Sequence, residues 1–234
     1  MKKEKMKKIL LIGDSVRIGY DAYVREGLKR AAEVSYPEEN CTSSYWVLRN
    51  LHIWADELEV YDADLVHFNA GHWDTLRIYG DPPITPIGVY KENLVRIVRR
   101  IRFLFPRAKL IFALSTPVIE SGFIEGFECR LNRDIEEYNR IAVEALSEFG
   151  VIINDLYSPL SARPGLHSDQ THFFTADGTG LIGGLVTDAV CGALGLDRSK
   201  LAVPDKAKFE ITKYKNDREL YVKKGDYYVP VIGI

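Results

Sequence analysis

Long apolar runs are missing from this 234-residue chain, although hydrophobic residues make up 46% of it. No stretch approaches the ~20 apolar residues that a membrane-spanning helix needs. The first apolar run covers only residues 9–12, whereas the apolar core of a secretory signal has about 7–15 residues. We therefore expect a cytoplasmic protein with no membrane partner.

Cysteine and excess charge are scarce as well. The three cysteines, Cys41, Cys129 and Cys191, lie far apart and form no Cys-x-x-Cys pair, so neither a disulfide framework nor a zinc knuckle is indicated. The formal net charge of −2 gives no global positive field to attract nucleic acid. No His, Asp and Glu grouping has the spacing of metal ligands. We expect reduced thiols, no metal, no cofactor and no nucleic-acid partner.

Short apolar segments alternate with segments of helical periodicity. Strands are predicted at residues 9–12, 33–36, 64–69, 109–114 and 151–153, and the clearest helices at residues 18–32, 87–105, 134–149 and 176–194. Thr85 is expected to cap the second of these helices and Thr175 the last one, which Gly195 would end. Strands separated by helices of this length predict βαβ units and a parallel sheet.

The final segment differs from the rest of the chain. From about residue 200 the polarity alternates weakly, and Gly225-Asp226 can form a turn. We expect a main domain over residues 1–197 and a C-terminal extension over residues 198–234 that contains a hairpin. The extension would pack on the domain or on a neighbouring copy, in which case the protein forms a homo-oligomer.

Polar residues gather where the predicted strands end. Ser15 directly follows the first strand, and residues 69–74, 116–117 and 155–157 follow later ones. Ligands of such sheets bind beyond the carboxyl ends of the strands. A serine in this position can act as a nucleophile if a base lies next to it, although a helix-capping serine is the simpler interpretation of Gly-Asp-Ser alone.

Asp169 and His172 supply the missing partners. Their spacing lets the carboxylate reach one imidazole nitrogen while the other nitrogen faces a serine. Without Ser15, a polar loop with a half-buried histidine would be the better explanation of these two residues. The other histidines are less suitable as bases, because His52 lies in a probable surface helix, His67 inside a strand, and His167 at an unsuitable offset from Asp169. Together, Ser15, His172 and Asp169 form the minimum set for acyl transfer.

Three segments resemble blocks I, III and V of the SGNH/GDSL hydrolase superfamily, and the resemblance spans about residues 7–195. They are residues 8–15 with Gly13-Asp14-Ser15, residues 69–74 with Gly71-His72-Trp73-Asp74, and residues 169–172. The resemblance implies a flavodoxin-like three-layer α/β/α sandwich with a five-stranded parallel sheet. It also implies that Ser15 is the nucleophile, His172 the base and Asp169 the acid that orients the base.

Two departures from the family pattern affect the expected oxyanion hole. The third block usually contains an asparagine, whose amide donates to the oxyanion, but Trp73 stands at that position. An indole keeps one N–H donor, and Asn69 is an alternative donor. The second block lacks its usual glycine in residues 40–43, so we expect the backbone N–H of Thr42 to serve with that of Ser15.

This resemblance leads us to expect a serine esterase that cleaves a short-chain carboxylic ester, such as an acetyl ester of a carbohydrate, through an acyl-enzyme. Asp14, His72, Asp74 and Phe173 are expected to contact this small-molecule substrate, and the loops at residues 74–85 and 119–130 to shape the alcohol side. One alternative is a thioesterase or lysophospholipase with the same triad. A second, favoured by Trp73, is a weak or inactive ligand-binding member. A flavin or nucleotide binder is disfavoured, because no phosphate-cradling glycine loop follows the first strand.

Overall fold

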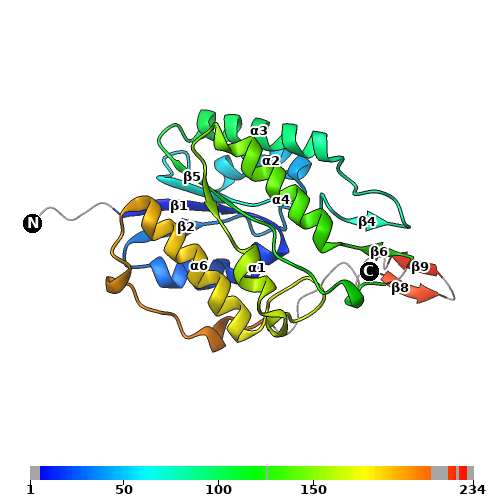
Figure 1. Ribbon diagram of the computed structural model, residues 1–234. Helices are drawn as coiled ribbons and strands as arrows, with labels where there is room; N and C mark the ends of the chain where they lie inside the picture. Colours follow the sequence, from blue (N-terminus) through cyan, green and yellow to red (C-terminus); the bar gives the residue numbers. More distant parts are fainter. Residues whose placement is uncertain (1–5, 125, 212–220, 225–226, 231–234) are drawn as a thin grey trace, which may run out of the picture.

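The computed structural model describes residues 6–124, 126–211, 221–224 and 227–230. A five-stranded parallel sheet in the order β2-β1-β3-β5-β7 forms the middle layer, with helices on both faces (Figure 1). The strands are β1 (Lys7–Ile12), β2 (Ala32–Ser35), β3 (Leu65–Phe68), β5 (Lys109–Ala113) and β7 (Ile152–Asn154). The helices are α1 (Ser15–Leu28), α2 (Ser44–Glu57), α3 (Ile87–Leu104), α4 (Asn132–Ser147), α5 (Tyr157–Ser161) and α6 (Ala176–Leu194). The predicted α/β/α fold class is confirmed.

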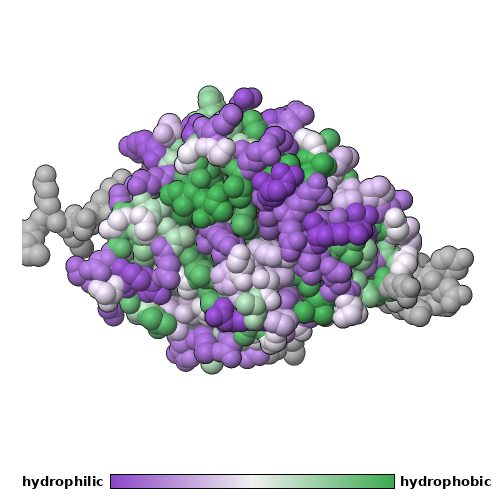
Figure 2. All heavy atoms as spheres, viewed as in Figure 1, coloured by the Kyte–Doolittle hydropathy of each residue, from purple (hydrophilic) through white to green (hydrophobic). Residues whose placement is uncertain are grey.

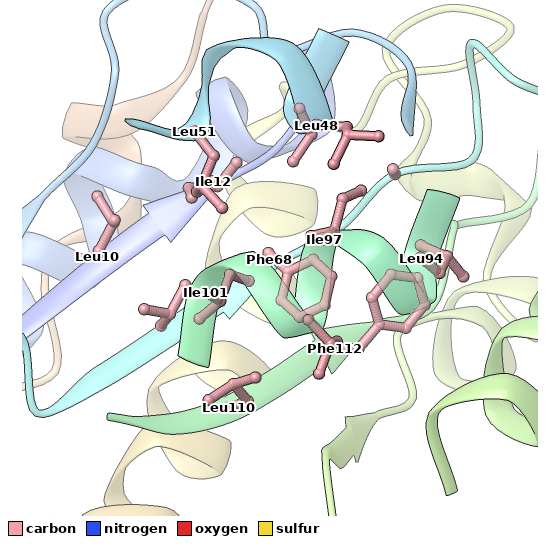
Figure 3. Close-up of a cluster of buried hydrophobic side chains, with 14 of the residues drawn as sticks. Leu10, Ile12, Leu48, Leu51, Phe68, Leu94, Ile97, Ile101, Leu110 and Phe112 are labelled. Carbon is pink, nitrogen blue, oxygen red and sulfur yellow. The ribbon is translucent and has the colours of Figure 1, made fainter. Parts of the chain in front are cut away.

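The sheet is buried on both faces, and this explains why its strands read as continuous apolar runs. Leu10 and Ile12 of β1 point to the layer formed by α2, α3 and α4, while Ile9 and Leu11 point to the layer formed by α1 and α6. The parallel register places Phe68 of β3 beside Phe112 of β5, with ring centroids 5.1 Å apart. Figure 3 shows these side chains against Leu48 and Leu51 of α2 and Leu94, Ile97 and Ile101 of α3.

Two short antiparallel ribbons lie outside the main sheet. One pairs β4 (Arg77–Ile78) with β6 (Glu128–Cys129), beyond the carboxyl ends of the main strands (Figure 1). The other pairs β8 (Tyr221–Lys224) with β9 (Tyr227–Pro230) and is the predicted C-terminal hairpin. The expected turn at Gly225-Asp226 lies outside the described residues. Before the hairpin, Lys206–Phe209 forms a 3₁₀ turn.

The capping residues predicted from the sequence are found at both ends of α6, whereas the one predicted for the start of α3 is not. The Thr175 hydroxyl accepts a hydrogen bond from the Gly178 N–H, and Gly195 ends α6 in the left-handed conformation with φ of 68°. Thr85 was expected to cap α3, but that prediction is wrong because Pro86 occupies the cap position and no side chain bonds to the helix start. Thr85 is instead buried, and its carbonyl accepts a hydrogen bond from the Tyr138 hydroxyl.

The face of the molecule drawn in Figure 2 is mainly polar. On the face in Figure 2, hydrophilic residues surround smaller groups of hydrophobic ones. In the part of the chain that the structure describes, none of the helices combines the length and apolar character needed to cross a bilayer. Among the same residues, no three His, Cys, Asp or Glu side chains gather where they could hold a metal ion.

The core predicts a strong difference between two phenylalanines. Phe112→Ala removes a fully buried ring and should lower the free energy of unfolding by about 3–5 kcal/mol. Phe103→Ala is the control, because that ring is 84% exposed on α3 and its loss should change stability by less than about 0.5 kcal/mol. Urea unfolding followed by circular dichroism measures both values, and similar losses in the two variants would contradict this packing.

Candidate active site

The turn between β1 and α1 presents Ser15 at the carboxyl edge of the sheet. Asp14 caps α1, because its carboxylate Oδ1 accepts a hydrogen bond from the Val16 N–H at 3.0 Å. Ser15 is therefore not the capping residue but the first residue of the helix. Its backbone N–H belongs to the first turn, where such groups have no partner inside the helix, and the helix dipole favours negative charge there.

Hydrogen bonds from the Arg17 side chain stabilise this turn. Its buried guanidinium donates to the Gly13 carbonyl at 3.4 Å, to the Asp21 carboxylate at 2.6 Å and to the Glu39 carbonyl at 2.5 Å. Because a buried charge is costly unless it is paired and hydrogen-bonded, these contacts tie the nucleophile turn to the loop that follows β2. Arg17 is a support that sequence reasoning did not identify.

The structure brings Ser15, His172 and Asp169 together. The imidazole Nε2 lies 2.7 Å from Ser15 Oγ, and Nδ1 lies 2.8 Å from Asp169 Oδ2. The second carboxylate oxygen of Asp169 accepts the N–H groups of Thr171 and His172 at 2.7 and 2.8 Å. Burial alone would raise the pKa of Asp169, but the hydrogen bonds and charge of its partners outweigh it and hold the pKa at about 2. Asp169 is thus ionised at neutral pH and can orient the imidazole.

Two of the four expected oxyanion donors already donate hydrogen bonds to other residues. Asn69 Nδ2 donates to the buried Asp14 carboxylate at 3.1 Å, and the Thr42 N–H donates to Asn40 Oδ1 at 2.9 Å. Trp73 is half-buried, and its indole N–H bonds to none of the described residues. The backbone N–H of Ser15 and the indole N–H of Trp73 are thus donors that bonds to other described side chains leave available.

The residues expected to contact substrate lie beneath the surface. Asp14 and Asp74 are 0% exposed, and His72 and Phe173 are 2% exposed. Both oxygens of Asp74 accept hydrogen bonds from Ser44, from its N–H at 2.9 Å and its hydroxyl at 2.6 Å. The contacts that the structure shows for these four side chains link loops and fill the core, and their contact with a substrate stays a prediction.

His72 and Phe173 show what these contacts consist of. His72 Nε2 bonds to the Thr116 hydroxyl at 2.9 Å, and burial, reinforced by the positive charge of Arg130, lowers the pKa of His72 well below its usual value. The ring is therefore neutral at pH 7. Phe173 packs on the His167 ring with centroids 3.9 Å apart and belongs to the apolar cluster beneath α1 and α6.

Arg130 is a site residue that the sequence did not reveal. It is buried, its Nε donates to the His72 carbonyl at 2.6 Å, and its guanidinium carbon lies 5.8 Å from the centre of the Trp73 ring. Its positive charge also acts to lower the pKa of Asp14, which burial raises. A single arginine at the end of a loop carries no recognisable spacing, so only the folded chain shows that it supports the third block.

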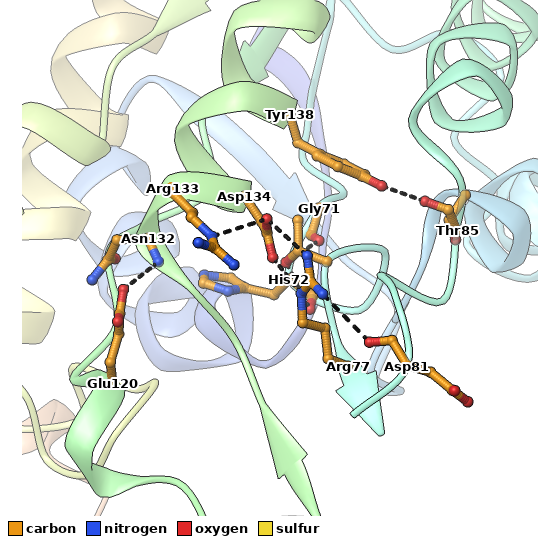
Figure 4. Close-up of polar contacts among 11 residues, drawn as sticks. Gly71, His72, Arg77, Asp81, Thr85, Glu120, Asn132, Arg133, Asp134 and Tyr138 are labelled. Carbon is orange, nitrogen blue, oxygen red and sulfur yellow. Dashed lines mark hydrogen bonds and ion pairs between the residues drawn. The ribbon is translucent and has the colours of Figure 1, made fainter. Parts of the chain in front are cut away.

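The loops at residues 74–85 and 119–130 meet beside the catalytic residues. The β4–β6 ribbon joins them, and Arg77 donates to the Asp134 carboxylate at 2.6 and 3.1 Å (Figure 4). Figure 4 also shows the Asn132 N–H bonded to Glu120 at 2.7 Å. A pocket of 430 Å³ lies here, with lining residues that include Phe123, Phe127, Glu120 and Glu128.

The segment that contributes Glu120 and Ser121 to this pocket contacts the loop at residues 169–172. The Ile119 N–H donates to the Gln170 carbonyl at 2.8 Å, and Gly122 packs closely on the Gln170 side chain. Gln170 lies between Asp169 and His172 in the sequence. Residues 119 and 122, which flank the lining residues Glu120 and Ser121, therefore contact the loop between Asp169 and His172.

Comparison with known proteins supports the fold and not a sequence family. No family model and no curated protein matches the chain. Among solved structures, a lipase/acylhydrolase from Enterococcus faecalis is 20% identical with a TM-score of 0.64, over 85% of this chain and 99% of that one. A GDSL-like lipase from Bacteroides thetaiotaomicron is 16% identical with a TM-score of 0.63, over 80% and 89% of the two chains.

An esterase structure gives a similar result. A catalytic mutant of an acetylxylan esterase from Geobacillus stearothermophilus is 16% identical with a TM-score of 0.60, over 85% of this chain and 98% of that one. At these identities the likeness establishes the fold. The chain therefore has the fold of GDSL-type hydrolases, and the resemblance predicted from the three blocks is confirmed at that level.

The low pKa of Asp169 predicts how acid affects stability. The pKa is about 2 in the folded protein against an ordinary value of 3.8, so the ionised carboxylate stabilises the fold above about pH 4, and this contribution disappears as the pH falls toward 2. Asp169→Asn lacks it at every pH. Urea unfolding of both proteins across this range should give a stability difference that shrinks on acidification. A difference that does not change with pH would contradict the assignment.

Proposed function

We propose that this protein is a serine hydrolase that cleaves short-chain carboxylic esters, with an acetyl ester of a carbohydrate as the favoured substrate. The observation that carries the proposal is the unbroken line of hydrogen bonds from Ser15 through His172 to Asp169. A serine hydroxyl is a weak nucleophile unless a base takes its proton, and a base works best when a third group orients it.

In the proposed reaction, Ser15 Oγ attacks the ester carbonyl carbon while His172 Nε2 takes the hydroxyl proton. The tetrahedral intermediate collapses, the carbon–oxygen bond to the alcohol breaks, and Nε2 returns the proton to the leaving alkoxide. Water then attacks the acyl-enzyme with His172 again as base, which releases the carboxylic acid and restores Ser15. Asp169 keeps the Nδ1 proton in place and stabilises the imidazolium in both steps.

We assign the oxyanion hole to the Ser15 N–H and the Trp73 indole N–H. The first lies at the positive end of α1, where developing negative charge is stabilised. The second occupies the position at which GDSL-type hydrolases usually have an asparagine, and its hydrogen is not used by the described residues. The Thr42 N–H fits less well because it already donates to Asn40, whereas Asn69 keeps a second Nδ2 hydrogen besides the one that Asp14 accepts and stays an alternative donor.

The surroundings favour a small acyl group and a polar alcohol. Asp14, His72, Asp74 and Phe173 are buried side chains, while the pocket between the loops at residues 74–85 and 119–130 mixes rings with charged residues (Glu120, Glu128 and Arg77). This mixture suits a hydroxyl-rich alcohol better than the long chain of a lysophospholipid or an acyl thioester. Acetylxylan esterases with the same fold add support for a carbohydrate ester.

Replacement of the nucleophile tests the reaction. Ser15→Ala should lower hydrolysis of p-nitrophenyl acetate by at least about 10⁴-fold, because the attacking oxygen is lost, and should abolish labelling by a fluorophosphonate probe. Ser147→Ala is the control, since that hydroxyl is exposed and bonds only within α4. Equal rates in wild type and Ser15→Ala would refute the triad. A wild type that neither hydrolyses nor labels would support the ligand-binding alternative.

Trp73→Phe tests the indole as an oxyanion donor. The variant keeps a large ring but loses the N–H, so kcat should fall by about 10²–10³-fold with little change in KM, as for other lost oxyanion donors. Trp46→Phe removes an exposed indole N–H that bonds to Glu39 and should leave kcat unchanged. Steady-state kinetics on one short-chain ester measure both, and an unchanged kcat in Trp73→Phe would remove the indole from the hole.

A further inference from the structure

The catalytic histidine is held on its face as well as at its nitrogens. Phe174 stacks nearly flat on the His172 imidazole, with ring centroids 4.5 Å apart and an angle of 14° between the planes. Asp169 bonds to the edge of the imidazole at Nδ1, which leaves the ring free to tilt about that bond. A flat ring against the face removes this freedom and so decides where Nε2 points.

Phe174 itself rests on a part of α1 that has no side chain. Gly19 lies four positions after Ser15, so both residues occupy the same face of the helix. A Cβ at Gly19 would lie 2.8 Å from Cδ1 and from Cε1 of Phe174, closer than real Cβ atoms approach other atoms. Glycine is one of the least favourable residues inside a helix, and here the close approach of the phenylalanine ring requires it.

The backbone of Phe174 is fixed from two further sides. Its N–H donates to the Ser168 hydroxyl at 3.1 Å, within the catalytic loop. Its carbonyl accepts a hydrogen bond from the Ile211 N–H at 3.0 Å. Ile211 belongs to the segment that follows α6, and Phe209 in the same segment packs edge-on against Tyr23 of α1 with ring centroids 5.5 Å apart.

From these contacts we propose that Phe174 is a positioning residue that sets the plane of the His172 imidazole. Gly19 in turn sets the position of Phe174, because the ring occupies the space that a side chain at residue 19 would fill. The proposal rests on the hydrolase function proposed above. Two residues on one face of α1, Ser15 and Gly19, meet two residues of the loop, His172 and Phe174. The separation between Nε2 and Oγ therefore depends on how closely the phenylalanine ring can approach the helix.

A double-mutant cycle on Gly19 and Phe174 tests this coupling. Gly19→Ala adds a methyl group where the ring lies, which should displace Phe174 and lower kcat by about 10–100-fold with KM changed less than about twofold, since a misplacement of ~1 Å can cost ~10² in rate. In the Phe174→Ala background the methyl group has room, so Gly19→Ala should lower kcat by less than about twofold more. Additive losses would overturn the proposal.

Gly27→Ala is the matched control in the same helix. A Cβ at Gly27 would lie 3.5 Å from Pro204 Cγ, an ordinary contact, so this variant should keep the wild-type kcat. Thermal unfolding of every variant shows whether it is folded. If Gly27→Ala loses as much activity as Gly19→Ala, the loss reflects alanine in the helix and the proposal fails.

Crystal structures of wild type and Gly19→Ala give a readout that does not depend on turnover. We expect the added methyl group to move Phe174 and to separate His172 Nε2 from Ser15 Oγ beyond hydrogen-bond distance. If Phe174 moves and the imidazole still bonds to Ser15, the positioning role is overturned. A wild type that is inert toward esters and fluorophosphonate refutes the hydrolase function, while the two structures still decide whether Phe174 positions the ring.

Discussion

The packing of α1 against α6 is the contact on which the catalytic geometry depends. Ser15 begins α1 and His172 precedes α6, so residues 157 positions apart in the chain meet only because these helices lie side by side. Gly183 of α6 allows the close approach, since a Cβ there would lie 2.4 Å from the Tyr23 ring of α1. Close-packed helices cannot shift without steric cost, so the serine and the histidine are held in register by the core.

Buried polar side chains fix the loops around this contact. Asp14 caps α1 and accepts from Asn69, while Asp74 joins the loop after β3 to the start of α2 through Ser44. Burial raises the pKa of both carboxyls, against the hydrogen bonds that they accept. A buried carboxylate that loses its donors is strongly disfavoured, so each of these groups holds two loops at a fixed separation and keeps the carboxyl edge of the sheet rigid.

Local patterns in the sequence predicted most of the sheet and the three residues of the proposed triad, but not their surroundings. Apolar runs located four of the five strands, and the pattern at residues 169–172 singled out two side chains that the structure brings to Ser15. The β4–β6 ribbon has only two residues in each strand, which is too short to show a periodicity. Arg130 contacts Trp73 and Phe174 packs against Gly19, both far away in the chain, and the burial of Asp74 is visible only in the folded protein.

Trp73 and Arg130 are best understood as a pair. An asparagine amide at this position is small and needs little support, whereas an indole is large and must be held in one orientation to place a single N–H. Arg130 can hold the indole in this way. Its Nε donates to the carbonyl of His72, the residue before Trp73, at 2.6 Å, and its guanidinium lies over the indole ring. Contact between a guanidinium and an aromatic ring is attractive, more so when shielded from water. The departure from the usual third block thus comes with a side chain that can stabilise it.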